Sequence, residues 1–443
     1  MNAFIRTCAA GMILVIACGP MRAQEPVVNP NLPNQPLAPS LTLAEAEHLA
    51  LEHNPRISIA RLLQLAQGQV TREVRSGEMP SVTGNLTAVD AHKGSAVTAG
   101  VLSNSSIYNR AAGGVTVSQL ITDFGRTRNL IHSADSESKA QVDAQRATIA
   151  DVVLAVDQAF YQALTSQAVL QVAQKTVAAR QATADQIGAL TSAKLKSSLD
   201  LSFANVELSQ ARLLLLDAQN AAQDSMTNLN ALLGSESNQQ YSLVDETPAN
   251  ATPAPDNAEP LVQTAFDARP DLAALKDSSA AARQFSAAEH DLSRPTVSAL
   301  GVMGGTPVRA DQITSSWYGA VGANVNIPIF NGFLYSARAR EADLRSSAAQ
   351  EQVRNLRELI ARDVRTSVLE AQAAFQRINV TRQLRDQSNI ALDLAQTRYQ
   401  LGLSGIVELS QAQLAQTQGE IAFANARYAY QTALATLNYQ TGQ

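Results

Sequence analysis

One long stretch of this sequence limits the possible folds more than any other feature. From Ser336 to Tyr399 there is neither glycine nor proline, so a single helix can run through the whole stretch. Apolar residues recur there at every third or fourth position, which is typical of a helix buried along one side. They are Val353, Leu356, Ile360, Val364, Val368, Ala371, Phe375 and Ile378. Such a helix reaches roughly 100 Å and needs a partner along its length.

The partner follows directly after a short break in the helix. Gly402 and Gly405 provide the backbone freedom for a tight turn, and Ser404 is expected to cap the helix that runs back. The two helices then form a helical hairpin. A second hairpin is predicted earlier in the chain, where a long helix from about Thr127 to Ile187 is followed by "GALTSAKLKSSLDLSFANVELSQARL".

The two hairpins belong to an internal duplication, which is visible as landmarks repeated at nearly constant spacing. The matched landmarks are Ala50 with Ala265 and Pro80 with Pro295 at an offset of 215, Gly125 with Gly332 at 207, and Asp200 with Glu408 and Gly234 with Gly442 at 208. A shorter loop in the second copy, residues 305–316 against 91–112, accounts for the fall in the offset.

Each copy contains the same elements in the same order. A helix comes first, at about 41–76 and 257–291, and it is followed by two strands and a long helical hairpin. We therefore expect a first copy at residues 41–236, a linker at 237–260 and a second copy at 261–443.

The clearest strand is "SWYGAVGANVNIPIF", in which residues from Trp317 to Ile329 alternate between two faces. Strict alternation over this length predicts a strand. A soluble strand averages about half this length, whereas a membrane strand needs about 9–11 residues with apolar side chains outward. Trp317 and Tyr318 at one end and Phe330 at the other are typical of membrane-interface aromatics. The alternative is a long strand in a soluble sandwich. Fainter partner strands are "SVTGNLTAV", "GGVTVSQLI" and "TVSALGVMG".

The N-terminus has the pattern of an export signal. A positive charge at Arg6 precedes a short apolar core at residues 9–17, which is too short to cross a bilayer. We expect a signal peptide at residues 1–23, cleaved after Ala23. The alternative is lipidation of Cys18 in the lipobox-like "VIACG". Residues 24–40 carry five prolines and predict an extended tether.

Composition excludes several classes of function. The net charge of −5 gives no basic field for nucleic acid. Both cysteines lie within the first 18 residues, and the five histidines are scattered, so we expect no metal site. There is no phosphate-binding glycine run, no catalytic triad and no paired-carboxylate site. We therefore expect no cofactor and no enzymatic activity.

The order and spacing of these features resemble the TolC-like outer-membrane efflux protein family. Members have two repeats of helix, strand, strand and long helical pair, an "NP" or "RPDL" motif in the first helix and a "DFG" or "FxG" motif after a strand. The match covers roughly residues 41–442. The resemblance implies an α+β membrane protein that forms a homotrimer. Three chains pool four strands each into one 12-stranded barrel in the outer membrane, and the helices continue it as a tube across the periplasm. Physical reasoning agrees, because four strands leave unpaired edges that lipid does not tolerate.

The resemblance also assigns roles to the hairpin tips, which form the periplasmic entrance in this family. Tyr399 matches the family's tip tyrosine, Gly402 its turn glycine and Glu408 an acidic pore residue, with Asp200 as the first-copy counterpart. The alternative for both acids is a solvated carboxylate at a helix start.

Three residues depart from the family pattern at the tips. Ser404 stands where some members have a gate-bonding arginine, and Gln411 where a second carboxylate is found. Lys194 occupies the turn-glycine position of the first copy, with Lys196 close by. We expect a weaker acidic ring than in those members.

These expectations lead to a passive exit duct for an efflux or type I secretion system, in the outer membrane of a Gram-negative-type bacterium with a large periplasmic portion. Its expected partners are a periplasmic adaptor protein at the hairpin tips and an inner-membrane pump of RND, ABC or MFS type. The alternative is an exported coiled-coil structural or surface protein without channel activity, which would not need long alternating strands.

Overall fold

The structure is a computed structural model that describes residues 39–90, 96–98, 104–106, 110–235, 239–248, 252–308 and 314–443. The chain divides into Met1–Pro39 and Ser40–Gln443. The predicted signal peptide, Cys18 and residues 24–38 of the tether lie outside the described residues. Ser40, which we assigned to the tether, instead belongs to β1 (Ser40–Leu41), which pairs in parallel with β6 (Ser242–Leu243) of the linker.

Within the described residues, the helices form two matching sets of four. They are α1 (Leu43–His53), α2 (Pro55–Arg75), α3 (Arg126–Ser192) and α4 (Ser198–Leu232), then α5 (Glu259–Ala268), α6 (Pro270–His290), α7 (Leu334–Gln400) and α8 (Ile406–Thr441), with short 3-10 turns at Ser76–Glu78 and Asp291–Ser293. Helices α3 and α7 each span 67 residues, which confirms the predicted long helices and extends both by a few residues.

The first helix of each copy is not continuous as predicted but is broken into two. The break falls at Asn54 before Pro55 and at Arg269 before Pro270, where both residues adopt extended backbone with φ −70 to −68° and ψ 122°. A proline disfavours helical backbone in the residue before it and lacks the N–H that would continue the hydrogen-bond ladder. Each break therefore starts a new helix with proline in its first turn.

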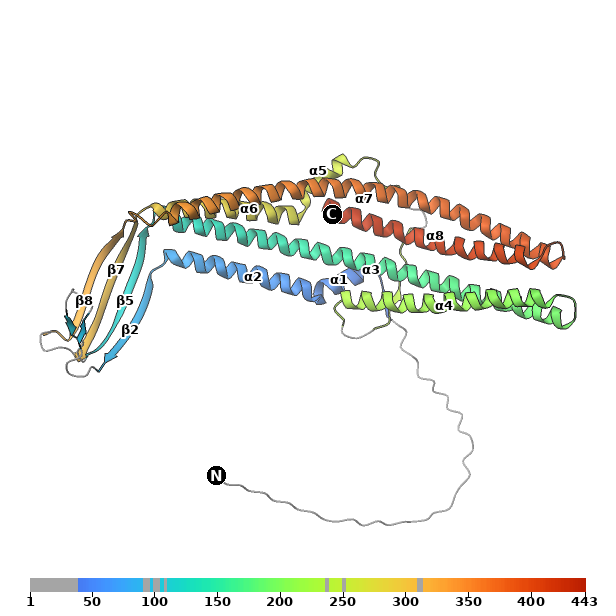
Figure 1. Cartoon of the computed structure of the whole chain (residues 1–443), viewed down its shortest axis with the longest axis horizontal. Helices are drawn as coiled ribbons and strands as arrows, with labels where there is room; N and C mark the ends of the chain where they lie inside the picture. The colour runs from blue at the N-terminus through green and yellow to red at the C-terminus, as the bar shows by residue number, and fades with distance from the viewer. Residues whose placement is uncertain are drawn as a thin grey trace, which may run out of the picture. The chain divides into compact units, whose positions relative to one another are not determined.

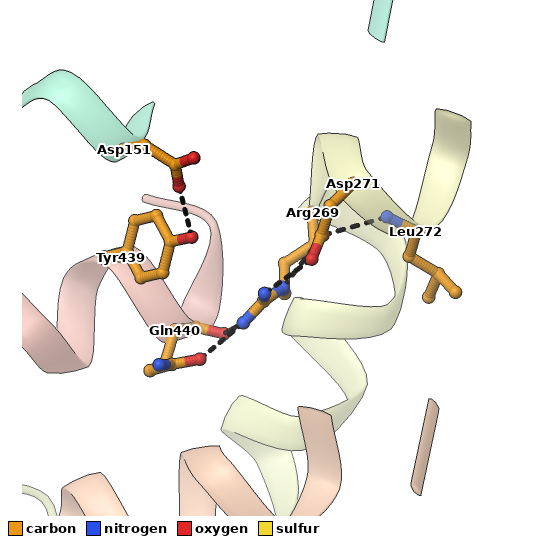
Figure 2. Close-up of polar contacts among 6 residues, drawn as sticks. All are labelled: Asp151, Arg269, Asp271, Leu272, Tyr439 and Gln440. Carbon is orange, nitrogen blue, oxygen red and sulfur yellow. Dashed lines mark hydrogen bonds and ion pairs between the residues drawn. The ribbon is translucent and has the colours of Figure 1, made fainter. Parts of the chain in front are cut away.

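The two breaks anchor the ends of the last helix in each copy. Asn54 donates from Nδ2 to the carbonyl oxygen of Leu232 at 2.8 Å. Arg269 lies at the equivalent position and donates from Nη1 to both the carbonyl and the side-chain oxygen of Gln440, while its other nitrogens bind Asp271 (Figure 2). Helix-end carbonyls that lack an intrahelical partner are thereby satisfied in both copies.

In each copy the last helix ends at a glycine that packs against the break in the first helix, and we call this contact the joint of the copy. Gly234 and Gly442 have φ of +74° and +77°. A Cβ on Gly234 would lie 2.5 Å from the carbonyl oxygen of His53, and one on Gly442 would lie 3.0 Å from the carbonyl carbon of Ala268. The duplication thus repeats a packed joint as well as an order of elements.

The long helices pack as antiparallel hairpins, α3 against α4 and α7 against α8, and α3 also contacts α6 and α8 (Figure 1). The predicted apolar seam of α7 is confirmed, because Ile360, Val364, Val368, Ala371 and Ile378 are buried. Among the described residues, no helix combines the length and apolar character needed to cross a membrane.

The main sheet lies at one end of the long helices and the turns of both hairpins lie at the other (Figure 1). Its strands are β2 (Ser81–Val89), β5 (Arg110–Thr122), β7 (Thr296–Val308) and β8 (Trp317–Asn326), antiparallel in the order β2-β5-β7-β8. A short pair, β3 (Ala96–Thr98) with β4 (Asn104–Ser106), lies in the longer first-copy loop. Each copy therefore contributes two neighbouring strands, and β2 and β8 are the edges of the sheet.

The two faces of this sheet differ in chemistry. Directly paired residues of an antiparallel sheet share a face, so the register assigns every side chain. One face carries large exposed apolar side chains, namely Val82, Leu86, Val115, Val117, Met303, Trp317, Val321 and Val325. The other face carries mostly small or polar side chains, among them Thr83, Asn85, Thr116, Ser118, Ser298, Asn324 and Asn326.

Two sequence expectations about the strand ends were wrong. Strand β8 ends at Asn326 rather than continuing to Ile329, because Pro328 cannot donate to a strand ladder and restricts the residue before it. The turn into the long helix also differs between copies. Phe124 and Gly125 have positive φ before α3, and Gly332 and Phe333 have positive φ before α7. The order of the two residues is reversed, so Gly332 lies at the position of Phe124 rather than that of Gly125.

Candidate functional site: the two hairpin tips

The turn between α3 and α4 uses a lysine where a glycine is usual. Lys194 adopts the left-handed conformation with φ +61°. The N–H of Leu195 donates to the carbonyl oxygen of Leu190 at 2.9 Å and that of Lys194 to Thr191 at 2.9 Å. This is the Schellman arrangement that closes a helix end. The N–H of Leu199 then donates to Ser197 Oγ at 3.1 Å, which caps α4.

The turn between α7 and α8 repeats the backbone of the first turn. Gly402 has φ +74°, and the N–H of Leu403 donates to the carbonyl oxygen of Arg398 at 2.8 Å. The predicted cap at Ser404 was wrong. Gly405 is the N-cap of α8 and gives no side-chain hydrogen bond. Ser404 Oγ is buried and has no hydrogen-bond partner among the described residues, because the serine lies one residue too early to reach the first turn of α8.

Tyr399 joins the two tips. Its side chain is 7% exposed and packs with residues from both hairpins, including Ile187, Leu208 and Leu409. The ammonium of Lys196 lies 4.2 Å from the centre of its ring, in the geometry of a cation–π contact. The second tip therefore inserts an aromatic ring that the basic first tip covers.

The Tyr399 hydroxyl is a polar group without a partner. It is buried and makes no hydrogen bond within the described part of the chain. Burial raises the pKa of Tyr399, and the negative charge of Asp200 raises it further. The tyrosine therefore stays protonated, and its hydroxyl keeps a hydrogen that it can donate.

The two predicted acidic residues occupy equivalent positions but different surroundings. Asp200 is the third residue of α4 and Glu408 the third of α8. Asp200 is partly exposed and near Tyr399. Glu408 is paired within its own hairpin, where Oε1 lies 2.9 Å from Nε of Arg398. Both are solvent-accessible, and Lys194 and Gln411 are also exposed, so the structure brings Lys196, Asp200 and Tyr399 together and leaves Gln411 apart.

A second polar cluster near the tips was missed by the sequence reading. The Arg180 side chain is 7% exposed, and its Nε lies 3.9 Å from Oε2 of Glu207. The hydroxyl of Ser410 donates to Oε1 of the same carboxylate. Glu207 follows Asp200 by seven residues, which is two helical turns along the same face. The seven-residue spacing from Asp200 could have pointed to Glu207. The sequence around Glu207 does not indicate that it pairs with the buried Arg180.

The predicted interface aromatics lie at the two ends of β8. Trp317 and Tyr318 start the strand and point to opposite faces of the sheet. Phe330 lies beyond the strand in the connection to α7 and contacts Phe333 edge-on at 5.8 Å between ring centres. Trp317 and Phe330 are 70% and 79% exposed.

A cavity of about 860 Å³ lies among α3, α6 and the end of α8, and its lining includes Glu47, Asp157 and Asp267. Within the described residues no group of three or more His, Cys, Asp and Glu side chains is placed to hold a metal ion.

Comparison with known proteins identifies relatives of the whole fold. The family model described as "Outer membrane efflux protein" matches residues 47–235 and 261–443. Outer membrane protein TolC of Salmonella enteritidis is 27% identical over 127 residues, and that of Escherichia coli (strain K12) is 28% identical over 127 residues. Each match covers 27% of this chain and 26% of the relative, so it spans about a quarter of the length of these curated relatives.

Solved structures resemble this chain over nearly its full length. The outer-membrane channel OprN superimposes with a TM-score of 0.80 at 20% identity, covering 90% of this chain and 89% of that one. The outer membrane protein VceC of Vibrio cholerae gives 0.78 at 19%, covering 90% and 96%. The open state of the MtrE channel of Neisseria gonorrhoeae gives 0.75 at 18%, covering 90% and 88%. These likenesses establish the fold.

Proposed function

The chain belongs to the outer membrane efflux protein family, and we propose that it is the outer-membrane exit duct of a tripartite efflux or type I secretion system. The observation that carries this proposal is the four-stranded sheet, with one exposed apolar face, one small and polar face, and edge strands β2 and β8. That division suits a barrel wall between lipid and water. The alternative, an exported coiled-coil protein, gives no reason for such a sheet.

The duct is a homotrimer in this proposal. Backbone groups at a sheet edge cannot remain unpaired in lipid, and the smallest membrane barrels have about eight strands. Four strands per chain therefore require several chains, and three chains pool them into a 12-stranded barrel. The two similar halves of each chain suit a tube with approximate sixfold symmetry, built from hairpins α3–α4 and α7–α8.

The hairpin tips are the entrance and the docking site in this proposal. Leu195, Leu199, Leu401, Leu403 and Val407 are between 51% and 70% exposed, which gives a periplasmic adaptor apolar surface to bind. An inner-membrane pump of RND, ABC or MFS type supplies the energy. Tyr399, Lys196 and Asp200 form the closing contacts around turns at Lys194 and Gly402, with Glu408 and Gln411 further along α8.

The first test is the mass and location of the protein. Outer membranes are separated on sucrose and extracted into detergent, and a trimer in that fraction supports the proposal. A periplasmic monomer would overturn it. Planar bilayers with the purified trimer then measure conductance.

Ion selectivity tests the acidic entrance. Because Glu408 is paired with Arg398, which offsets part of its charge, Asp200→Asn should reduce cation preference more than Glu408→Gln. The double variant should reduce it most. Unchanged ion selectivity in the double variant would show that neither carboxylate faces the pore.

A further inference from the structure

We propose that a cavity between α7, α8 and the linker binds a small organic carboxylate, with the guanidinium of Arg382 as its charged ligand. The cavity has a volume of about 280 Å³ and includes Thr247 of the linker in its wall. It lies on the second hairpin and shares no residue with the hairpin tips. The site is a property of the folded chain and does not depend on the proposed channel function.

The cavity is lined by two rows of side chains on neighbouring helices. Ile378 and Arg382 are four residues apart on α7. On α8 the same spacing separates Phe423, Arg427 and Gln431. Residues four apart lie above one another on one face of a helix, and α7 packs against α8 as an antiparallel pair. Two guanidinium groups and two apolar side chains therefore line one small space.

Arg382 is a half-buried cation without a partner in the protein. Within the described residues it makes no hydrogen bond and no ion pair. The other arginines of α7 that lack both are exposed to solvent, namely Arg338, Arg340, Arg357 and Arg377. Withdrawing a charged group from water without supplying an opposite charge is unfavourable. An anion in the cavity would supply that charge to Arg382.

Arg427 can add hydrogen bonds to the same anion. Its Nη2 lies 2.8 Å from Oδ2 of Asp245 and donates to the carbonyl oxygen of Thr247 at 3.4 Å. Its Nε and Nη1 make no hydrogen bond in the part of the chain that the structure describes. A guanidinium presents five N–H donors in a planar fork that matches a carboxylate. Asp245 thus holds Arg427 in place while the remaining donors stay free for a ligand.

The apolar part of the wall indicates an anion with a hydrocarbon chain. Ile378 is buried and Phe423 is half-buried. An inorganic ion makes no use of these side chains, whereas a short hydrocarbon chain gains free energy by leaving water against them. The small volume limits that chain to a few carbon atoms. A short organic carboxylate satisfies both parts of the wall.

The first copy has the same apolar positions without the charges. At the positions 208 residues earlier, the apolar residues remain apolar and the glutamine remains a glutamine, but both arginines are replaced, by Gln174 and Gln219. The hairpin of α3 and α4 packs without these charges. The two arginines are therefore not a requirement of hairpin packing, and a ligand on the second hairpin accounts for them.

The test measures binding of isovalerate, a short branched carboxylate, to the purified full-length protein in detergent by saturation-transfer NMR. Saturable binding in the millimolar range is expected. Arg382→Gln, which introduces the side chain of the first copy, should weaken binding by about tenfold because a charge-assisted hydrogen bond is lost. Arg377→Gln removes an exposed arginine of the same helix and should bind isovalerate like the wild type. Isovaleramide, which lacks the charge, should not bind.

Thermal unfolding of the same variants separates ligand binding from a structural role. Without isovalerate, Arg382→Gln should unfold at no lower temperature than the wild type, because it removes an unpaired charge. Isovalerate should raise the unfolding temperature of the wild type and of Arg377→Gln but not that of Arg382→Gln.

Several outcomes would overturn the site. They are the absence of saturable isovalerate binding, equal binding by the wild type and Arg382→Gln, and a lower unfolding temperature of Arg382→Gln without ligand. Inorganic phosphate that binds as tightly as isovalerate would overturn the assignment to an organic carboxylate. None of these results bears on conductance, so the proposed function stands or falls by its own test.

Discussion

The two hairpin tips share a backbone and differ in nearly every functional side chain. Both turns close with the same hydrogen bonds and one left-handed residue, Lys194 in one and Gly402 in the other. The first tip is basic and capped by Ser197, whereas the second places Tyr399 against its neighbour and has no side-chain cap. The two tips therefore share the geometry of the turn, while their side chains form complementary surfaces.

The same contrast appears at the joints where each copy closes. Asn54 and Arg269 fill equivalent positions and reach equivalent carbonyls. Only Arg269 adds an ion pair, in which the buried guanidinium binds the partly exposed carboxylate of Asp271. Comparing the stability of variants at Asn54 and at Arg269 therefore measures what the additional ion pair contributes.

The largest effect is expected at the joints. Arg269→Ala should destabilise the protein by about 3 kcal/mol, because it removes the hydrogen bonds to Gln440 and leaves the Asp271 carboxylate with the N–H of Leu272 alone. Asn54→Ala should cost about 1–2 kcal/mol, since one buried hydrogen bond is lost. Thermal unfolding of the detergent-solubilised protein, followed by helical circular dichroism, measures both. Arg345→Ala, in an exposed pair with Glu341, is the control and should change little. Equal losses at Arg269 and Asn54 would show that the ion pair adds nothing to the joint.

A smaller effect is expected in the dependence of stability on pH. It arises in the first copy, where the first helix contacts the long helix, and the second copy differs at the equivalent contact. Burial, together with the charge of Glu47, raises the pKa of Asp157 from 3.8 to about 7. The folded protein therefore holds this proton between about pH 4 and 7 whereas the unfolded chain releases it, so stability falls as pH rises through this range. Asp157→Asn should remove the fall and stabilise the protein at pH 8 by about 1–2 kcal/mol, after allowance for partial solvent screening.

The second copy supplies the control for the pH effect. Arg365 stands 208 residues beyond Asp157 and pairs with Glu259 at 2.9 Å. Glu259→Gln should leave the slope of stability against pH between 5 and 8 unaltered, because this pair is exposed and of opposite charge. If Asp157→Asn keeps the wild-type slope, the Glu47–Asp157 contact is not the source of the dependence.

The smallest effect is expected in the turns. Gly402→Ala should cost about 1 kcal/mol, because a Cβ in the left-handed conformation is unfavourable. Lys194→Gly should gain about 0.5 kcal/mol, since relief of the same strain is partly offset by the greater freedom of glycine in the unfolded chain. Chemical denaturation of both variants measures these shifts. A loss on Lys194→Gly would mean that its side chain stabilises the tip by more than the turn conformation costs.

Much of the fold could be predicted because it depends on short-range patterns. The absence of glycine and proline between Ser336 and Tyr399 allowed one helix, the 3.6-residue period gave its buried side, and the two-residue period gave β8. Prolines at 55 and 270 could have revealed the broken first helices, since a proline restricts the residue before it.

The site was predicted less completely than the fold. The positions of Tyr399, Gly402, Asp200 and Glu408 follow from their spacing to the turns. Their partners do not, because Lys196 meets Tyr399 and Glu207 meets Ser410 across about 200 residues of sequence. Local pattern carries no information about such pairs.

The sequence by itself determined the elements of this protein, their order and their repetition, because helix and strand periods and glycine and proline positions act on neighbouring residues. Tertiary structure decided which charges are neutralised. Glu408 was paired with Arg398, Glu207 with Arg180 and Ser410, and Arg269 with Asp271 and Gln440. Electrostatic energy depends on distance and burial in space, and for most of these groups neither can be obtained from position along the chain.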